Sequence, residues 1–213
     1  MYFHYGEKET DYLRAKDPAL GAVIDKVGHI DRSIDPDLFS SVVHQIIGQQ
    51  ISTKAQTTIW NRMQDAFGEV NPEVIAAADT DLLQSFGMTF RKTEYIREFA
   101  GKVSDGSFDL NEIRNLPDKE AAARLTSLRG VGVWTAEMIL LFCLERPDIL
   151  SFNDLAIRRG LRMVYHHRSI SRELFEKYRR RYSPYGSVAS LYLWAVAGGA
   201  VEGLTDPARP KKD

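Results

Sequence analysis

The 213-residue sequence has one cysteine and no long run of apolar residues. A single cysteine, Cys143, excludes a disulfide framework, a four-thiolate zinc site and an iron–sulfur cluster held by thiolates of the chain. No apolar run approaches the ~18 residues that a membrane-spanning helix needs. The first residues carry charges where a signal peptide would have its apolar segment, so we expect an intracellular protein that does not enter a membrane.

The sequence also lacks a strong net charge, since 28 Lys and Arg face 29 Asp and Glu. The two signs are unevenly distributed, however. Residues 151–213 carry 12 Lys and Arg against 6 Asp and Glu, whereas residues 1–150 carry 16 against 23. Such a basic stretch fits a surface that follows phosphates, but a solvated helical face explains it equally simply. Charge alone therefore leaves a nucleic-acid partner open.

Apolar residues recur with helical spacing, and no pair of strands, repeat or low-complexity tract interrupts them. The spacing over residues 39–47 predicts one helix, and a capping-box spacing from Thr53 to Gln56 predicts the start of the next. The break between these helices is expected to expose Gln49 and Gln50. The same spacing predicts further helices over about 80–86, 91–103, 117–128, 134–144, 155–164 and 184–201. Two more helices are expected to begin near Pro72 and at Ser171. The fold class predicted is all-α.

Two glycines lie between the helices predicted over 117–128 and 134–144, in the stretch Leu128-Arg129-Gly130-Val131-Gly132-Val133. Glycine permits the positive φ angles of a very tight turn and the close approach of another backbone. Because a helix follows at once, its first N–H groups and the positive end of its dipole fit an anion such as a DNA phosphate. From these residues alone, close helix packing is the simpler explanation.

Four ordered segments extend this motif: IIGQQISTKA, FGMTFRKTEYIREFA, LTSLRGVGVWTAEMILL and SFNDLAIRRGL. Together they resemble the helix–hairpin–helix DNA glycosylase superfamily over about residues 38–200, and most of all its 3-methyladenine (alkylated-base) branch. The resemblance implies two helical subdomains with a cleft between them, one spanning 37–146 with the hairpin and the other combining 1–36 with 147–213. It also implies base-excision repair by hydrolysis of the N-glycosidic bond of flipped-out alkylated bases, such as 3-methyladenine and 7-methylguanine, in duplex DNA.

The resemblance places the catalytic carboxylate at Asp154, 22 residues beyond Gly132 and at the start of a helix. A carboxylate suits this reaction, because cleavage of a glycosidic bond builds positive charge on the sugar. The carboxylate would stabilise that charge and orient the attacking water. The structural alternative is that Asp154 caps its helix, but Asn153 is available as a separate cap.

Position 134 distinguishes two mechanisms within the superfamily. Members that also cut the DNA strand have a lysine there to form a Schiff base, whereas this sequence has Trp134. We therefore expect a monofunctional glycosylase that leaves an abasic site. Trp134 and Trp194 match the aromatic residues of the base pocket, where an indole face attracts a positively charged base. Met138 stands where a third aromatic is common, with Glu137 beside it, and core packing is an equally good explanation for Trp194.

The resemblance also implies how the protein holds DNA. Gln50, supported by Gln49, would fill the gap that the flipped nucleotide leaves in the stack. Gly130, Gly132 and Thr135 would bind phosphate, with Arg158, Arg159 and Arg162 as electrostatic helpers. A structural monovalent metal ion would be held by the main-chain carbonyls of Thr126, Leu128 and Val131.

No cofactor is expected for the chemistry, and no iron–sulfur cluster. The expected partner is double-stranded DNA containing damaged bases, bound by a monomer in the cytoplasm of a bacterium or the nucleus of a eukaryote. Three alternatives remain open at this point. The chain could be a monofunctional glycosylase for uracil, a deaminated base or a mispaired base, a helix–hairpin–helix module that binds DNA without catalysis, or a purely structural helical protein.

Overall fold

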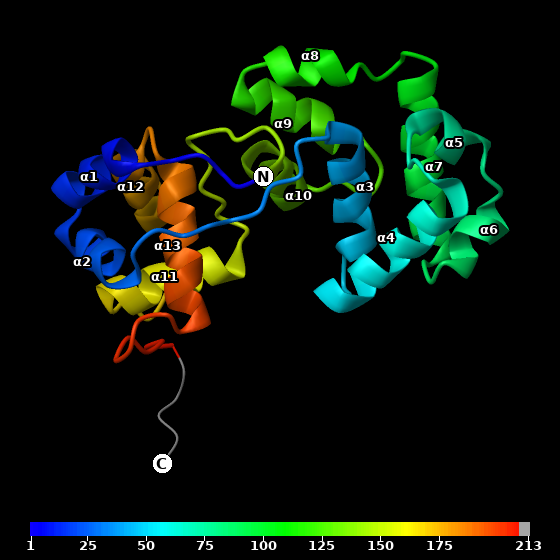
Figure 1. Ribbon diagram of the computed structural model, residues 1–213. Helices are drawn as coiled ribbons and strands as arrows, with labels where there is room; N and C mark the ends of the chain where they lie inside the picture. The colour runs from blue at the N-terminus through cyan, green and yellow to red at the C-terminus, as the bar shows by residue number, and fades with distance from the viewer. Residues whose placement is uncertain (209–213) are drawn as a thin grey trace. The chain divides into compact units, whose positions relative to one another are not determined.

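The computed structural model describes residues 1–208, and in that range it is built from α-helices (Figure 1). Among residues 1–208, the only extended pairing is one isolated bridge between Tyr2 and Ser33. The all-α prediction is therefore confirmed. Within residues 1–208, no helix combines the length and apolar character needed to cross a membrane.

The chain divides into two compact units, and one of them is built from both ends of the chain. Unit 1 comprises residues 1–34 and 145–213, and unit 2 comprises residues 35–144. The boundaries expected from the sequence, 36/37 and 146/147, lie near these divisions. The helices of unit 1 are α1 (Glu7–Lys16), α2 (Pro18–Val27), α11 (Leu155–Tyr165), α12 (Arg172–Tyr182) and α13 (Gly186–Gly198). Those of unit 2 are α3 (Leu38–Gly48), α4 (Thr53–Phe67), α5 (Pro72–Ala77), α6 (Thr80–Ser85), α7 (Phe90–Ser104), α8 (Leu110–Asn115), α9 (Asp118–Thr126) and α10 (Val133–Phe142).

In unit 2, side chains that accept from main-chain amides cap the first turns of helices α3 and α4. Asp37 caps α3 by accepting from the Ser40 amide at 2.7 Å. Helix α4 begins at Thr53 as predicted, but its cap is Ser52, whose hydroxyl accepts from the Ala55 amide at 3.2 Å. The expected capping box from Thr53 is therefore wrong. Gln56, its proposed second member, instead sends its side-chain amide back to the carbonyl of His44 in α3, at 2.7 Å.

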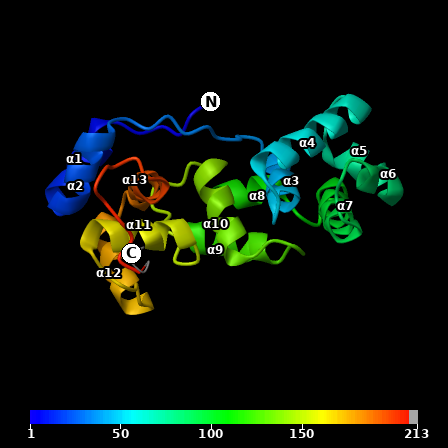
Figure 2. The same cartoon turned by 90° about the horizontal axis from the view of Figure 1, so that it is seen from below.

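Helix α7 packs against several other helices of unit 2. It lies beside α5 and α6 (Figure 2), and it also packs on α3. The Phe99 ring of α7 stacks on Phe39 of α3, with 5.2 Å between centroids and 17° between planes. Thr89 begins α7 by accepting from the Lys92 amide at 3.4 Å. The first turn of α7 lies next to the end of α3, because Lys92 donates from Nζ to the carbonyl of Ile47.

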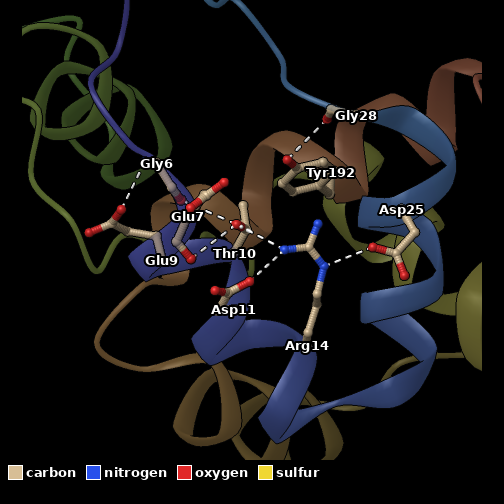
Figure 3. Close-up of polar contacts among 9 residues, drawn as sticks. All are labelled: Gly6, Glu7, Glu9, Thr10, Asp11, Arg14, Asp25, Gly28 and Tyr192. Atoms are coloured by element: carbon tan, nitrogen blue, oxygen red, sulfur yellow. Dashed lines mark hydrogen bonds and ion pairs between the residues drawn. The ribbon is translucent and has the colours of Figure 1, made fainter.

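In unit 1, polar side chains lock α1, α2 and α13 together (Figure 3). Arg14 of α1 donates to Asp25 of α2 and to Asp11 one turn earlier, both at 2.8 Å. The Tyr192 hydroxyl of α13 donates to the carbonyl of Gly28, which ends α2, at 3.1 Å. These bonds give α13 a fixed position against the N-terminal helices of this unit.

Helix α11 packs tightly on α13, and the reason is one glycine. A Cβ atom at Gly160 would collide with the main-chain carbonyl of Leu193, so only glycine allows this approach. Ser190 of α13, which is fully buried, donates to the carbonyl of Ile149 at 2.9 Å. The irregular segment 149–154, which carries Asp154 and leads into α11, is therefore held against α13.

Candidate active site

The hairpin between α9 and α10 turns at Gly130. This residue has φ +84°, a conformation that side-chain-bearing residues rarely adopt. A Cβ atom here would also collide with the Tyr95 ring of α7. Glycine is thus required at position 130 for two reasons, the positive φ of the turn and the close approach of the Tyr95 ring.

Gly132 differs from Gly130, contrary to the expectation that both glycines would serve the turn. Its φ is −88°, which any residue can adopt, and a Cβ atom at Gly132 would meet nothing within 4 Å. Neither backbone strain nor internal packing therefore explains a glycine at this exposed position. A bare surface that lets another molecule approach the backbone does explain it.

Helix α10 begins directly after Gly132 and presents an exposed first turn. Its first intrahelical bond runs from the Ala136 amide to the Gly132 carbonyl at 2.9 Å. Val133 and Trp134 are 54% and 40% exposed, which is unusual for large apolar side chains. The Thr135 side chain is buried, so a phosphate contact by this residue would use its main-chain amide. The helix dipole favours an anion at this end.

The loop after α3 lies against the hairpin through one of its two glutamines. Gln50 is exposed and has φ +60°, a left-handed conformation that costs a residue with a side chain free energy. Gln49, expected to be exposed as well, is instead turned inward. Its side-chain amide donates to the Gly130 carbonyl at 2.7 Å. The loop therefore presents Gln50 and uses Gln49 as an anchor.

The residues expected to line a base pocket differ in exposure. Met138 on α10 is buried, with 3% of its surface exposed, whereas Glu137 is half-buried. Trp194 on α13 is half-buried, while its neighbours Leu193 and Tyr192 are buried. Trp194 thus keeps part of its surface accessible.

Asp154 is the N-cap of α11. One carboxylate oxygen, Oδ1, accepts from the amides of Ala156 and Ile157 at 2.8 and 2.9 Å. The structural alternative considered for Asp154, a helix cap, is therefore what the structure shows, and the exposed Asn153, which was available as a separate cap, lies one residue too early. Asp154 is 7% exposed, so its carboxylate is held in one orientation with little water around it. The positive end of the helix dipole stabilises the anion there.

The arginines expected to assist DNA binding have partners within unit 1. Arg162 makes a two-pronged ion pair with Asp206, at 2.8 and 2.6 Å, and Arg159 lies 3.8 Å from the same carboxylate. The Arg162 hydrogen bonds hold the pKa of Asp206 at about 2. The Arg158 guanidinium lies over the Phe152 ring, 5.0 Å from its centroid. Arg162 is thus a structural residue that holds Asp206, and Arg159 shares the same carboxylate.

The carbonyls named for a metal ion belong to the end of α9 and to the turn. The Leu128 carbonyl accepts from the Val131 amide at 3.1 Å, which leaves one of its two lone pairs. Carbonyl oxygens suit a hard cation, so this donor set fits a monovalent ion. Within residues 1–208, no three His, Cys, Asp or Glu side chains gather as metal ligands. Burial raises the pKa of Cys143 to about 12, so this thiol is no nucleophile at neutral pH.

Two residues of α7 that support these loops were not singled out from the sequence. Lys92 donates from Nζ to the carbonyls of Ile47 and Gln49, at 2.7 and 2.6 Å, and burial lowers its pKa. Tyr95, one turn later, contacts Gly130 and lies under the Arg129 guanidinium, 4.9 Å from the ring centroid. Both lie in the FRKTEY segment, but no local pattern reveals partners more than thirty residues away.

A hairpin between two helices, followed by a buried carboxylate that caps the next helix, defines a helix–hairpin–helix protein of the DNA glycosylase type. The sequence pattern of the HhH-GPD superfamily base excision DNA repair proteins matches residues 43–184. The chain belongs to this superfamily, and the resemblance inferred from its motifs is confirmed.

Individual relatives agree with this assignment. The structure is similar to a crystal structure of a DNA-3-methyladenine glycosidase from Bacillus halodurans, with 32% identity, 93% of each chain covered and a TM-score of 0.83. It is also similar to the Schizosaccharomyces pombe 3-methyladenine DNA glycosylase Mag1 in complex with abasic DNA, with 27% identity, 90% of this chain and 97% of that chain covered, and a TM-score of 0.78. In sequence, it is 29% identical to DNA-3-methyladenine glycosylase 1 of S. pombe over 179 residues, or 82% of this chain and 78% of the relative.

Proposed function

We propose that this protein is a monofunctional DNA glycosylase of base-excision repair that removes alkylated bases, of the 3-methyladenine and 7-methylguanine type, from duplex DNA. The observation that carries the proposal is the buried carboxylate of Asp154, fixed by two amides at the start of α11. Membership of the repair superfamily and likeness to 3-methyladenine glycosylases from two organisms support it.

Asp154 is the catalytic residue of this proposal. As the bond between C1′ and the base breaks, positive charge builds on the deoxyribose, and a nearby carboxylate stabilises it. The bonds from Ala156 and Ile157 fix the carboxylate before the substrate arrives, so no reorganisation is needed during the reaction. The carboxylate also orients the water that attacks C1′. The base leaves with the electron pair of the bond to C1′, the water oxygen bonds to C1′, and the carboxylate takes up the proton that this water loses.

Two aromatic residues contribute to the choice of base. Trp134 and Trp194 are the aromatic residues that the family resemblance assigns to recognition of the base, and a positively charged ring gains roughly 0.5–2 kcal/mol from contact with an indole face. The positive charge also makes the alkylated base a better leaving group than a normal base. Because Trp134 has no amine, it forms no Schiff base with the sugar, and the product is an intact strand with an abasic site.

The hairpin and the loop after α3 hold the DNA. The bare backbone at Gly132 and the first amides of α10 bind a phosphate, and Gln50 fills the gap left in the stack. A glutamine can also hydrogen-bond to the orphaned base. A monovalent cation on the carbonyls of Thr126, Leu128 and Val131 would add positive charge beside that phosphate.

Base release from defined DNA tests the proposal. Duplex DNA treated with a methylating agent is incubated with the protein, and free bases are separated by chromatography. We expect free 3-methyladenine and 7-methylguanine, strand breaks only after hot alkali, and no covalent adduct with borohydride. Release of uracil or hypoxanthine from duplexes that contain those bases, with no release from methylated DNA, would assign the protein to another lesion. Binding of abasic DNA without release of any base would make it a binding module.

A further inference from the structure

The loop that carries Gln50 is held only weakly by its own main-chain hydrogen bonds. Its own main-chain bonds, from Gln49 to the Ile46 carbonyl and from Ile51 to the Gly48 carbonyl, are both 3.4 Å long. Gln50 also has the left-handed φ of +60°, which costs of order 1–2 kcal/mol for a residue with a side chain. A conformation of this kind persists only where surrounding groups impose it.

Lys92 supplies that constraint from α7. Its Nζ donates to the carbonyls of Ile47 and Gln49, and charged donors make the stronger hydrogen bonds. The Gln49 carbonyl belongs to the peptide group that leads into Gln50, so fixing it fixes the direction in which Gln50 leaves the loop. The ammonium also stands at the C-terminal end of α3, where the helix dipole favours a cation.

The same turn of α7 holds the hairpin. Tyr95 lies three residues after Lys92, on the same side of the helix, and its ring contacts Gly130. Gln49 closes the arrangement by donating to the Gly130 carbonyl at 2.7 Å. The loop and the hairpin are thus joined both directly and through α7, all within unit 2.

We propose that Lys92 is a positioning residue that holds Gln50 in its inserting conformation before DNA binds. The proposal rests on the glycosylase function, since it names the residue through which Gln50 acts. Lys92 itself touches no reacting atom. Preorganisation of the loop lowers the ordering cost of each insertion, so loss of Lys92 slows removal of a base from paired DNA.

A double-mutant cycle between Lys92 and Gln50 tests this. The variants are K92M, Q50A and the double variant, and K102M is the matched control, because Lys102 lies on the same helix and its Nζ pairs with Glu98 of that helix at 2.7 Å. Base release from a methylated duplex is measured in single turnovers at saturating enzyme. We expect K92M to slow release at least about tenfold, and K102M to stay within about twofold of the natural protein. In the Q50A background, K92M should cost no more than about a further twofold.

A second readout needs no base release. Duplex DNA with 2-aminopurine opposite an abasic site reports insertion as a change in fluorescence. We expect the natural protein and K102M to give the change and K92M to lose most of it, with K92R restoring part because it keeps the charged donors. Circular dichroism checks that each variant is folded, and K92Q, which keeps a donor, replaces K92M if K92M is not.

The outcomes separate the two proposals. Absence of base release by the natural protein contradicts the glycosylase function. Equal fluorescence changes from the natural protein and K92M overturn the role of Lys92. The same role is overturned if K92M slows the Q50A variant by the full factor that it costs the natural protein.

Discussion

The side-chain amide of Gln49 donates to the main-chain carbonyl of Gly130 at 2.7 Å, across 81 residues of sequence. This bond joins the loop after α3 to the hairpin before α10, the two segments that the proposed function brings to DNA. Of the two adjacent glutamines, one therefore anchors the loop and the other, Gln50, stays exposed on it. The roles follow from backbone geometry, because Gln50 alone has a positive φ.

Replacing Gln50 by glycine should stabilise the folded protein and slow its release of bases. Glycine adopts φ +60° without the cost of a side chain, so we expect Q50G to gain up to about 1 kcal/mol in the free energy of unfolding relative to Q50A. Both variants lose the side chain that fills the stack, and both should release bases from duplex DNA more slowly. Urea unfolding and single-turnover assays measure the two effects. A Q50G protein less stable than Q50A would show that the left-handed backbone carries no strain.

The two hairpin glycines should respond differently to alanine. G130A places a methyl group at φ +84° and against the Tyr95 ring, so we expect a loss of at least about 2 kcal/mol in stability. G132A has an ordinary φ and open space, so its stability should stay within about 1 kcal/mol of the natural protein. Its affinity for abasic DNA should nevertheless fall, because the methyl group obstructs the approach of a phosphate. Unchanged DNA affinity in G132A would remove this residue from the DNA contact.

Asp206 should give the protein an acid-sensitive stability. Its pKa is about 2 in the folded protein, against an ordinary 3.8, mainly because of the hydrogen bonds from Arg162. A lowered pKa contributes stability that is present above about pH 4 and is lost as the pH falls through about 2. The contribution at neutral pH is of order 2 kcal/mol.

The D206N variant measures this contribution. We expect urea unfolding to show the natural protein more stable than D206N at pH 6, with the difference shrinking steadily between pH 4 and pH 2. D65N, which removes an exposed carboxylate of α4, is the control and should show no such trend. A difference between the natural protein and D206N that stays constant down to pH 2 would contradict the role of the Arg162 pair.

Local rules account for much of this fold. Helical spacing located most of the helices, because it acts within a few residues, and the structure caps them just as locally, with Asp37 before α3 and Ser171 before α12. The motifs located the hairpin and Asp154. One error was also local, because Ser52 caps α4 in place of Thr53. Asn153 and Asp154 were both available as caps of α11, and the structure uses Asp154.

Partners distant in the sequence could not be predicted. Lys92 bonds to carbonyls 43 and 45 residues away, and main-chain acceptors leave no mark in a sequence. Arg162 was expected to help bind DNA, but Asp206, 44 residues later, takes its guanidinium. Gly130 is required by the fold and Gly132 is not, and this difference depends on the φ angle and on the position of the Tyr95 ring. Neither can be read from the amino-acid sequence.

The central claim is that the Asp154 carboxylate performs the chemistry, and D154N tests it most directly. Asparagine keeps a side-chain oxygen for the amides of Ala156 and Ile157, so the cap survives and the stability should change by less than about 1 kcal/mol. D154A, which loses the cap, should be less stable by about 0.5–2 kcal/mol. These two variants separate the capping role of Asp154 from its charge.

The measurement is the single-turnover release of 3-methyladenine from duplex DNA by the natural protein and by D154N, each shown to be folded and to bind abasic DNA. We predict that D154N is slower by at least about a hundredfold, because the neutral amide cannot stabilise the positive sugar. Release by D154N at the rate of the natural protein would contradict the account and leave Asp154 as a helix cap alone.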